Sequence, residues 1–246
     1  MSMLSDLTWP EVRDRAEAGA TLVVPLGSTE QHGPHLPVST DADLALALAL
    51  ELDNRRPDIV VGPLISYGSS GEHAGFPGTL SIGQEALELL LLELGRSAAM
   101  TFAHLLLVST HGGNAEPVRR AVDRLRTESR DLLAWSPRLR GDAHAGHTET
   151  SLLLFLRSSR VRMDLAAAGD TRPIGELMLI LRERSVQAVS PNGVLGDPTG
   201  ASSDLGAAMF RKLADDLAAA VRKWRDHPAA DAGAPMVQTA ARSSRP

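Results

Sequence analysis

The sequence predicts a single α/β domain of three layers, a mostly parallel sheet with helices on both faces. Short apolar runs alternate with longer helix-forming segments, the pattern of strand–helix–strand units. The 246 residues are 43% hydrophobic but only 3% aromatic, so one sizeable and largely aliphatic core is expected. No repeat or linker divides the chain. We expect one domain over residues 1–228 and a disordered tail over 229–246, which is rich in Ala, Gly, Ser and Pro.

The first half of the chain alternates helix, strand, helix and strand. Residues 8–18 predict a helix because Thr8 opens a capping box with a proline in the first turn. The apolar runs 21–26 and 59–62 predict buried strands. Between them, the Leu- and Ala-rich residues 43–55 predict a helix by composition and length.

The second half continues this alternation after a Gly- and Ser-rich loop at 66–79. Residues 84–101 predict a long helix with leucines on one face. The run 104–109 predicts a third strand, 115–126 a helix, and 131–135 a fourth strand.

Two further helices are expected towards the end of the chain. One begins at Thr148 and continues to Leu156, and the last runs from Ser202 or Ser203 to about Arg225. The glycine-containing run 193–200 lacks the Lys-Ser/Thr pair of a nucleotide-binding loop.

Three loop-like segments concentrate side chains that bind divalent cations. The first follows the run 21–26 and contains Glu30, His32 and Asp41. Glu30 and His32 are two residues apart, so in an extended loop both can approach one cation. Asp41 stands at the entrance of the next helix, where it could ligate a cation or cap the helix; Asp43 is the reserve candidate.

The second segment, His111 to Asn114, lies between a predicted strand and a predicted helix. His111 is a candidate metal ligand. Gly112 and Gly113 would let a substrate come close to the backbone. Asn114 is equally well explained as a cap of the next helix.

The third segment contains His144, His147 and Glu149. Glu149 is a candidate metal ligand and catalytic residue, although an acid in the first turn of a helix is favourable in itself. His144 is a candidate for proton transfer, because an unperturbed imidazole titrates near neutral pH.

The loop at 66–79 supplies candidates for substrate binding. These are Tyr67, Ser70, Glu72 and His73, and a plain solvated loop is the alternative explanation of the same residues.

Composition excludes several classes of partner and site. The chain has no cysteine, which excludes disulfides and thiolate metal sites. The net charge of −5 without a basic run argues against a nucleic-acid partner. No apolar run reaches the roughly 18 residues that span a bilayer, and residues 1–6 lack the features of a signal peptide. We therefore expect a cytoplasmic protein with no membrane contact.

Taken together, the three ligand-rich segments resemble the creatininase (creatinine amidohydrolase) family, in order and spacing, over residues 21–210. The resemblance implies a creatininase-like fold, a homo-oligomer and two divalent ions, which can be Zn, Fe or Mn. Glu30, Asp41 and His111 would hold one ion. His32 and Asp41 would hold the other, so that Asp41 bridges the pair.

The chain departs from the family pattern at one ligand. Creatininase draws a further ligand from a Glu two residues after the His that matches His111, and this chain has Gly113 there. We expect Glu149 to replace it. The same departure weakens a creatinine substrate, as does the scarcity of tryptophan: Trp135 is the only one near the relevant loop.

Within the family, the chain is most similar to the branch encoded with mycofactocin biosynthesis. The segments 27–37, 67–83, 143–154 and 193–199 carry this similarity. It implies a peptidase that acts on a modified, ribosomally made precursor peptide and releases its C-terminal valine–tyrosine-derived unit.

The mechanism expected from these residues is hydrolysis by an activated water. Two cations would lower the pKa of a bridging water to about 7, and the resulting hydroxide would attack an amide carbonyl. His144 would pass a proton to the departing nitrogen. The alternatives are a hydrolase of creatinine-like cyclic amides or formamides and a non-catalytic metal-binding scaffold.

Overall fold

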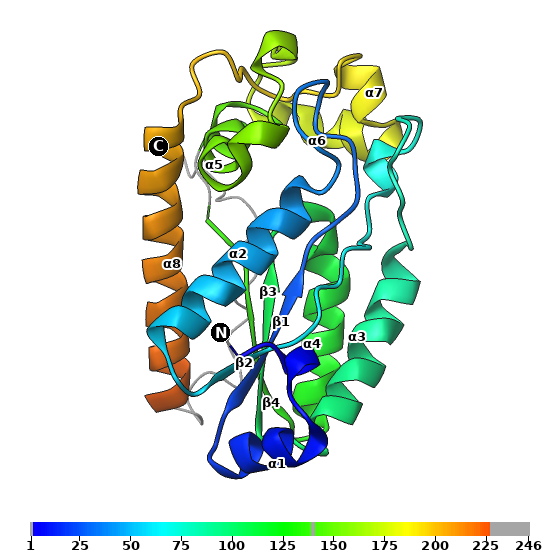
Figure 1. Ribbon diagram of the computed structural model, residues 1–246. Coiled ribbons are helices and arrows are strands. Elements are labelled where there is room, and N and C mark those ends of the chain that lie inside the picture. Colours follow the sequence, from blue (N-terminus) through cyan, green and yellow to red (C-terminus); the bar gives the residue numbers. More distant parts are fainter. Residues whose placement is uncertain (1, 139–140, 227–246) are drawn as a thin grey trace, which may run out of the picture.

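Four parallel strands form the centre of the molecule, in the order β2-β1-β3-β4 (Figure 1). β1 (Thr21–Leu26) pairs with β2 (Ile59–Val61) on one side and with β3 (His104–Ser109) on the other. β4 (Asp131–Trp135) pairs with the outer side of β3. The computed structural model describes residues 2–138 and 141–226, and it confirms the parallel sheet expected from the sequence.

One face of the sheet is covered by α2 (Thr40–Arg55), α5 (His147–Arg157) and α8 (Ser203–Asp226) (Figure 1). Alternate residues of a strand point to the same face, and this face receives one such set. The strand side chains packed here are Val23, Ile59, Val61, Leu106, Val108, Leu133 and Trp135.

The opposite face is covered by α1 (Trp9–Glu17), α3 (Gln84–Ala98) and α4 (Ala115–Thr127). The strand side chains packed here are the intervening ones, Leu22, Val24, Leu26, Val60, Leu105, Leu107 and Leu132. Burial on both faces explains why the strands are continuous apolar runs. The three-layer α/β prediction is confirmed.

Most predicted boundaries agree with the structure to within a few residues. The capping box of α1 is present, with the Thr8 N–H donating to Glu11 Oε2 at 2.7 Å. Two ends differ: α2 begins at Thr40 instead of residue 43, and α3 ends at Ala98 instead of residue 101. Asp41 therefore lies inside the first turn of α2.

Two helices beyond α5 have no counterpart in the sequence prediction. α6 (Ile174–Glu183) and α7 (Val186–Val189) lie beyond the carboxyl ends of the strands (Figure 1). Leu177, Val186 and Leu195 form a small cluster of their own there, separate from the two faces of the sheet. Five short 3-10 helices complete the described chain: Leu4–Asp6, Gly71–His73, Gly112–Asn114, Ser158–Arg160 and Met163–Leu165.

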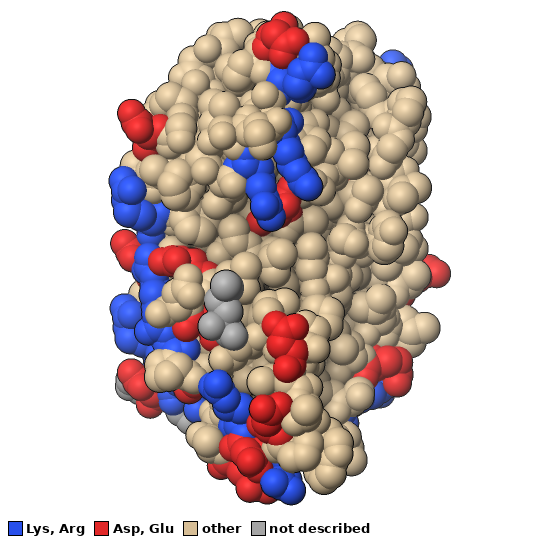
Figure 2. All heavy atoms as spheres, viewed as in Figure 1, with Lys and Arg blue, Asp and Glu red and all other residues tan. Residues whose placement is uncertain are grey.

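The charged surface is mixed. On the face shown in Figure 2, Lys and Arg side chains lie next to Asp and Glu side chains, mainly along α8 and at the end near α1. Among the described residues, no helix has the length and apolar character needed to cross a membrane. The tail predicted at 229–246, and with it the predicted boundary at residue 228, lies outside the described residues.

Candidate metal centre

The predicted ligands converge at the carboxyl ends of β1 and β3. β2 lies on one side of β1 and β3 on the other, so a topological switch point lies between β1 and β3, the usual ligand position in such sheets. Gly27 ends β1 against the backbone of α2: a Cβ there would lie 2.5 Å from Ala42 N and 2.8 Å from the Asp41 carbonyl carbon. Only glycine permits this approach, which brings Asp41 beside the strand ends.

Glu30, Asp41 and His111 form the first ligand group. Their candidate ligand atoms all lie within 4.8 Å of one another, and all three residues are buried. His111 Nε2 is 3.2 Å from Glu30 Oε2, and its Nδ1 is 3.3 Å from Asp41 Oδ2. Two carboxylates and an imidazole suit a divalent cation such as Zn²⁺ or Mn²⁺.

His32, with Asp41 and Glu149 beside it, forms the second group; candidate ligand atoms of His32, His144 and Glu149 also lie within 4.8 Å of one another. His32 Nε2 lies 3.6 Å from Asp41 Oδ1 and 3.8 Å from Glu149 Oε2. His32 Nδ1 is 3.2 Å from the Glu30 carbonyl oxygen, which can only accept, so the lone pair of the neutral ring is on Nε2. Oδ1 of Asp41 faces His32 and its Oδ2 faces His111, the arrangement expected of a carboxylate shared by two ligand groups.

Two orphaned atoms test whether these residues fit metal ions. Glu30 Oε2 and His32 Nε2 are buried and make no hydrogen bond with the described residues, although they face His111 Nε2 at 3.2 Å and Asp41 Oδ1 at 3.6 Å. Leaving such groups unpaired costs about 1–3 kcal/mol each, and more for charged groups. A cation in each group would bind one of these atoms, so the residues present fit two divalent ions.

The pKa values reflect the crowding of carboxylates and imidazoles. Burial lowers the pKa of His32, but Asp41, Glu149 and Glu30 outweigh it and raise the pKa to about 10. Burial raises the pKa of Glu30, but His111 outweighs it and lowers the pKa to about 2. Burial, only partly opposed by His32, raises the pKa of Glu149 to about 7. The pKa of His111 is raised as well, so His32 and His111 are protonated when no cation is bound.

Neighbouring side chains fix the ligands. Ser28 Oγ donates to Asp41 Oδ2 at 2.6 Å, and Thr110 Oγ1 donates to the Asp41 carbonyl at 2.7 Å. Asn114 occupies the N-cap position of α4, as one interpretation proposed, but its side chain makes no capping hydrogen bond there. Its amide instead donates to the Gly27 carbonyl at 2.8 Å and accepts from the Ser69 N–H at 2.9 Å, which ties the ends of two loops together.

Asp43, the reserve ligand, lies outside both groups. Its carboxylate accepts from Ser39 Oγ at 2.9 Å and pairs with Arg157 and Arg160 at 3.4 and 3.5 Å. The fixed 100° step of the helix turns Asp41 towards the strand ends and Asp43 towards α5 and the segment after it.

A cleft of about 980 Å³ opens onto the ligand groups. Glu72, His73, Gly112 and Gly113, predicted to bind substrate, all line it. Part of the remaining lining comes from α6, from the residue after it and from the start of α7, which the sequence did not predict: Ile174, Leu181, Arg184 and Val186.

Tyr67 and Ser70 were also predicted to bind substrate, and neither is among the residues that line this cleft. Tyr67 is half exposed, while Ser70 is fully buried with Oγ 3.3 Å from His111 Nε2. Ser70 therefore contacts the candidate metal ligand His111 and does not face the cleft.

Gly113 has a steric reason to be glycine. A Cβ there would overlap the Ser69 carbonyl oxygen and lie 2.6 Å from Glu72 Oε1. The carboxylate of Glu72 thus occupies space that a side chain at position 113 would need, which explains the absence of a glutamate there.

His144 lies beside His32 of the second ligand group and beside His73. Its ring centroid is 4.3 Å from that of His32 and 4.4 Å from that of His73. Burial, together with the two neighbouring imidazoles, holds its pKa well below the ordinary value, so the ring is neutral. Its Nδ1 is 3.8 Å from Glu30 Oε1, and the residue lines the cleft.

Strained backbone and a capping aspartate position Glu149. Ala145 has a left-handed conformation (φ 52°), which costs about 1–3 kcal/mol for a non-glycine residue. This turns its N–H towards Glu149 Oε2 at 2.6 Å. Asp142 accepts from the N–H groups of His147 and Thr148 and so caps the start of α5.

Sequence reasoning did not single out Gln31, whose amide contacts His73 and His144. The position of Gln31 between the predicted ligands Glu30 and His32 could have indicated a role at the site. His35, the second imidazole of the first segment, contacts Thr150 Oγ1 at 2.8 Å and anchors the loop to α5.

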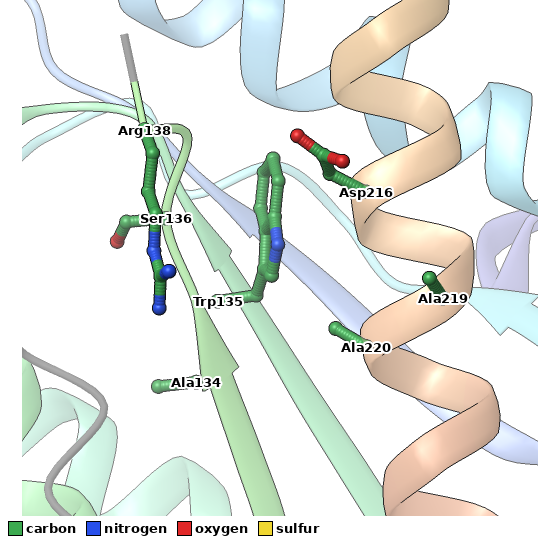
Figure 3. Close-up of a pocket in the computed structure, with 7 residues that line it drawn as sticks. All are labelled: Ala134, Trp135, Ser136, Arg138, Asp216, Ala219 and Ala220. Carbon is green, nitrogen blue, oxygen red and sulfur yellow. The ribbon is translucent and has the colours of Figure 1, made fainter.

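A second pocket, of about 270 Å³, lies between the end of β4 and α8 (Figure 3). Trp135 forms one wall, with Arg138 and Asp216 nearby (Figure 3). Trp135 was noted as the tryptophan nearest the predicted site; it belongs instead to the core under α8 and does not line the cleft.

The chain is similar to known proteins over most of its length. The family model described as "Creatininase: Creatinine amidohydrolase" matches residues 5–221. The mycofactocin precursor peptide peptidase of Mycobacterium ulcerans (strain Agy99) is 46% identical over 231 residues, which are 90% of this chain and 88% of that protein. The protein of the same name from Mycolicibacterium smegmatis is 46% identical over 211 residues, 83% and 85% of the two chains.

A solved structure described as creatininase with Mn superposes with a TM-score of 0.79 at 25% identity. The match covers 91% of this chain and 98% of that one. It confirms the creatininase-like fold.

Proposed function

The chain belongs to the creatininase family, and from this premise we propose that it is a metal-dependent amide hydrolase that acts as a peptidase on the mycofactocin precursor peptide. The bond cleaved would be the one that releases the modified C-terminal valine–tyrosine-derived unit. Near-full-length identity of 46% to peptidases of that name supports the substrate. The observation that carries the chemistry is Asp41, whose two carboxylate oxygens face two separate ligand groups.

We propose that two divalent ions bind there. Glu30, Asp41 and His111 would hold one ion, and His32, Asp41 and Glu149 the other. The nitrogen and oxygen donors accept Zn, Mn and Fe alike. When bound, such ions lower the pKa of water and polarise a carbonyl oxygen.

His144 moves the proton in this proposal. The neutral ring accepts the proton that water loses as its oxygen attacks the amide carbonyl. It then gives that proton to the nitrogen as the C–N bond breaks, which yields a carboxylic acid and an amine. Glu149 would hold one ion together with His32. Glu72, His73 and the glycine pair of the cleft wall contact the peptide, while Tyr67 and Ser70 shape the loop around it.

Metal analysis together with peptide cleavage tests this function. The purified protein should contain two divalent ions and release the modified dipeptide unit from the precursor, but not open creatinine. Glu30→Gln or His32→Ala should lose metal and turnover together. His144→Ala should keep its metal and turn over slowly. Full activity of a metal-free Glu30→Gln protein would refute the proposal, and bound metal without any hydrolysis would indicate a scaffold.

The cytoplasmic location and the homo-oligomer expected from the sequence stay predictions. Cell fractionation and light scattering on the purified protein would test them.

A further inference from the structure

The side chain of Gln31 lies between two imidazoles that line the cleft. Its Nε2 is 2.9 Å from His73 Nδ1 and 3.0 Å from His144 Nε2. The rings of these histidines are themselves adjacent, with centroids 4.4 Å apart. Because Gln31 is buried, each of its hydrogen-bonding atoms needs a partner within the protein.

Backbone groups determine which way the Gln31 amide points. Oε1 accepts from the Gly33 N–H at 2.8 Å, and Nε2 donates to the Gly193 carbonyl at 3.0 Å. An N–H can only donate and a carbonyl can only accept, so the amide cannot be reversed. Both partners are glycines in the left-handed region, with φ of 66° and 78°, and a Cβ on Gly193 would overlap the amide.

This orientation places a proton on one particular nitrogen of His73. Nδ1 faces the donating Nε2 of Gln31 and must accept, so the neutral ring carries its proton on Nε2. That N–H faces Glu30 Oε1 at 3.4 Å, longer than the roughly 2.9–3.0 Å of a good hydrogen bond. Glu30, His73 and His144 have the spacing of a third cation site. A protonated Nε2 cannot bind a cation, so His73 would not be a ligand of such a site.

His144 has the same tautomer but presents its other nitrogen to Glu30. Its Nε2 is 2.8 Å from the main-chain carbonyl of Gln31, which can only accept, so Nε2 carries the proton. The lone pair is therefore on Nδ1, which faces Glu30 Oε1 at 3.8 Å. The side chain of Gln31 thus leaves the Nε2–H of His73 facing Glu30, and its main-chain carbonyl leaves the Nδ1 lone pair of His144 facing the same residue.

We propose that Gln31 is a positioning residue that locks both tautomers, and that His73 Nε2–H donates a hydrogen bond to the scissile carbonyl oxygen as negative charge develops on it. This rests on the proposed amide hydrolysis. A neutral imidazole suits the task because it donates without repelling the nearby cations. His73 is then a catalytic residue rather than a general substrate contact.

Histidine side-chain NMR tests the tautomers without any activity assay. Long-range ¹H–¹⁵N spectra of the zinc-loaded protein should show His73 protonated at Nε2, with its signals identified by their loss in His73→Gln. In Gln31→Glu, whose carboxylate can only accept, His73 should become protonated at Nδ1. A wild-type His73 protonated at Nδ1 would overturn the proposal. Gln187→Glu, the same change at an exposed glutamine of α7, should leave the spectrum of His73 unchanged.

Kinetics on the precursor peptide test the role. Gln31→Glu and His73→Leu should lose about 10²–10³-fold in kcat with little change in KM and with both zinc ions retained. His73→Gln, which can present an N–H near the same place, should recover part of the loss relative to His73→Leu. Loss of zinc in Gln31→Glu, or wild-type kcat with a switched tautomer, would refute the role. A wild-type protein that cleaves no peptide would instead refute the proposed function, while the NMR result would still decide the tautomers.

Discussion

At the scale of single residues, Asp41 is the candidate ligand that the two ligand groups share. It is buried, accepts from Ser28, and faces an imidazole with each oxygen. The sequence offered capping as an alternative role, and the structure places the residue past the cap position of α2.

Asp41→Asn should abolish binding of both ions, because an amide provides one neutral oxygen where two charged ones are needed. We expect metal content to fall from two ions per chain to near zero, and peptide cleavage to fall at least 10³-fold. Elemental analysis of the purified protein measures the first. Asp43→Asn is the matched control, two residues along the same helix, and should keep both ions. Two ions bound to the Asp41 variant would contradict a bridging role.

Metal affinity should rise with pH. The pKa of His32 is raised to about 10 and that of His111 is raised as well, so both rings are protonated at pH 7 in the metal-free protein. A cation must displace one proton from each ring, and lowering the pH therefore weakens binding. We expect the logarithm of each association constant to rise by about one per pH unit.

Protonation of Glu149 should also affect how metal affinity changes with pH. Its pKa is raised to about 7, so binding at the group that contains it should become steeper below that pH. Calorimetric titration of metal into the metal-free protein, in buffers of different protonation enthalpy, counts the protons released. Affinity that does not change between pH 6 and 8 would show that the rings are not the ligands.

At the scale of elements, the second ligand group depends on how α5 packs against α8. Glu149 is in the first turn of α5, and Gly206 of α8 touches the backbone of that helix at Ser151. A Cβ at Gly206 would overlap the Ser151 carbonyl oxygen, which is backbone and cannot rotate away. The contact therefore sets the distance between the two helices.

Gly206→Ala should push α5 away from α8 and destabilise the fold by about 1–3 kcal/mol through overpacking. The same shift should displace Glu149 and weaken one ion more than the other. Thermal unfolding and metal titration measure the two effects. Gly175→Ala, in α6, where a Cβ would meet nothing within 4 Å, should leave stability unchanged or slightly raised. Equal behaviour of both variants would argue against the contact.

At the scale of the whole molecule, the centre joins segments that lie far apart in the chain. The candidate ligands come from the loop after β1, from α2, from the loop after β3 and from α5. Cations bound by these segments would bind the folded chain and would have no equivalent site in the unfolded one.

Removing metal should therefore lower stability. At a free metal concentration 100 times Kd, each ion adds about 2.7 kcal/mol. For a chain of this size that corresponds to about 5–10 °C in Tm per ion. Unfolding scans with chelator and with added Zn²⁺ measure the shift, and the Asp41→Asn protein should show none. A Tm independent of metal would contradict a centre built from these segments.

Much of the architecture was predictable because its signals are local. A capping box at Thr8, apolar runs of strand length and Leu-rich helices each specify an element from neighbouring residues. Parallel order follows because helices separate the strands. α6 and α7 were not predicted. Leu177 and Val186 pack with Leu195 in a small cluster separate from the sheet, so the strand–helix alternation does not indicate these helices.

The sequence by itself determined the α/β fold, the ligand types and the family, because these depend on residue identity and spacing. Only the tertiary structure decided that Asp41 faces both groups, that Asp43 turns away, that Ser70 lies beneath His111, and that Gln31 orients two imidazoles. Those facts depend on distances between segments up to 162 residues apart, such as Gln31 and Gly193. Spacing along a chain cannot specify such distances, because packing of the whole core sets them.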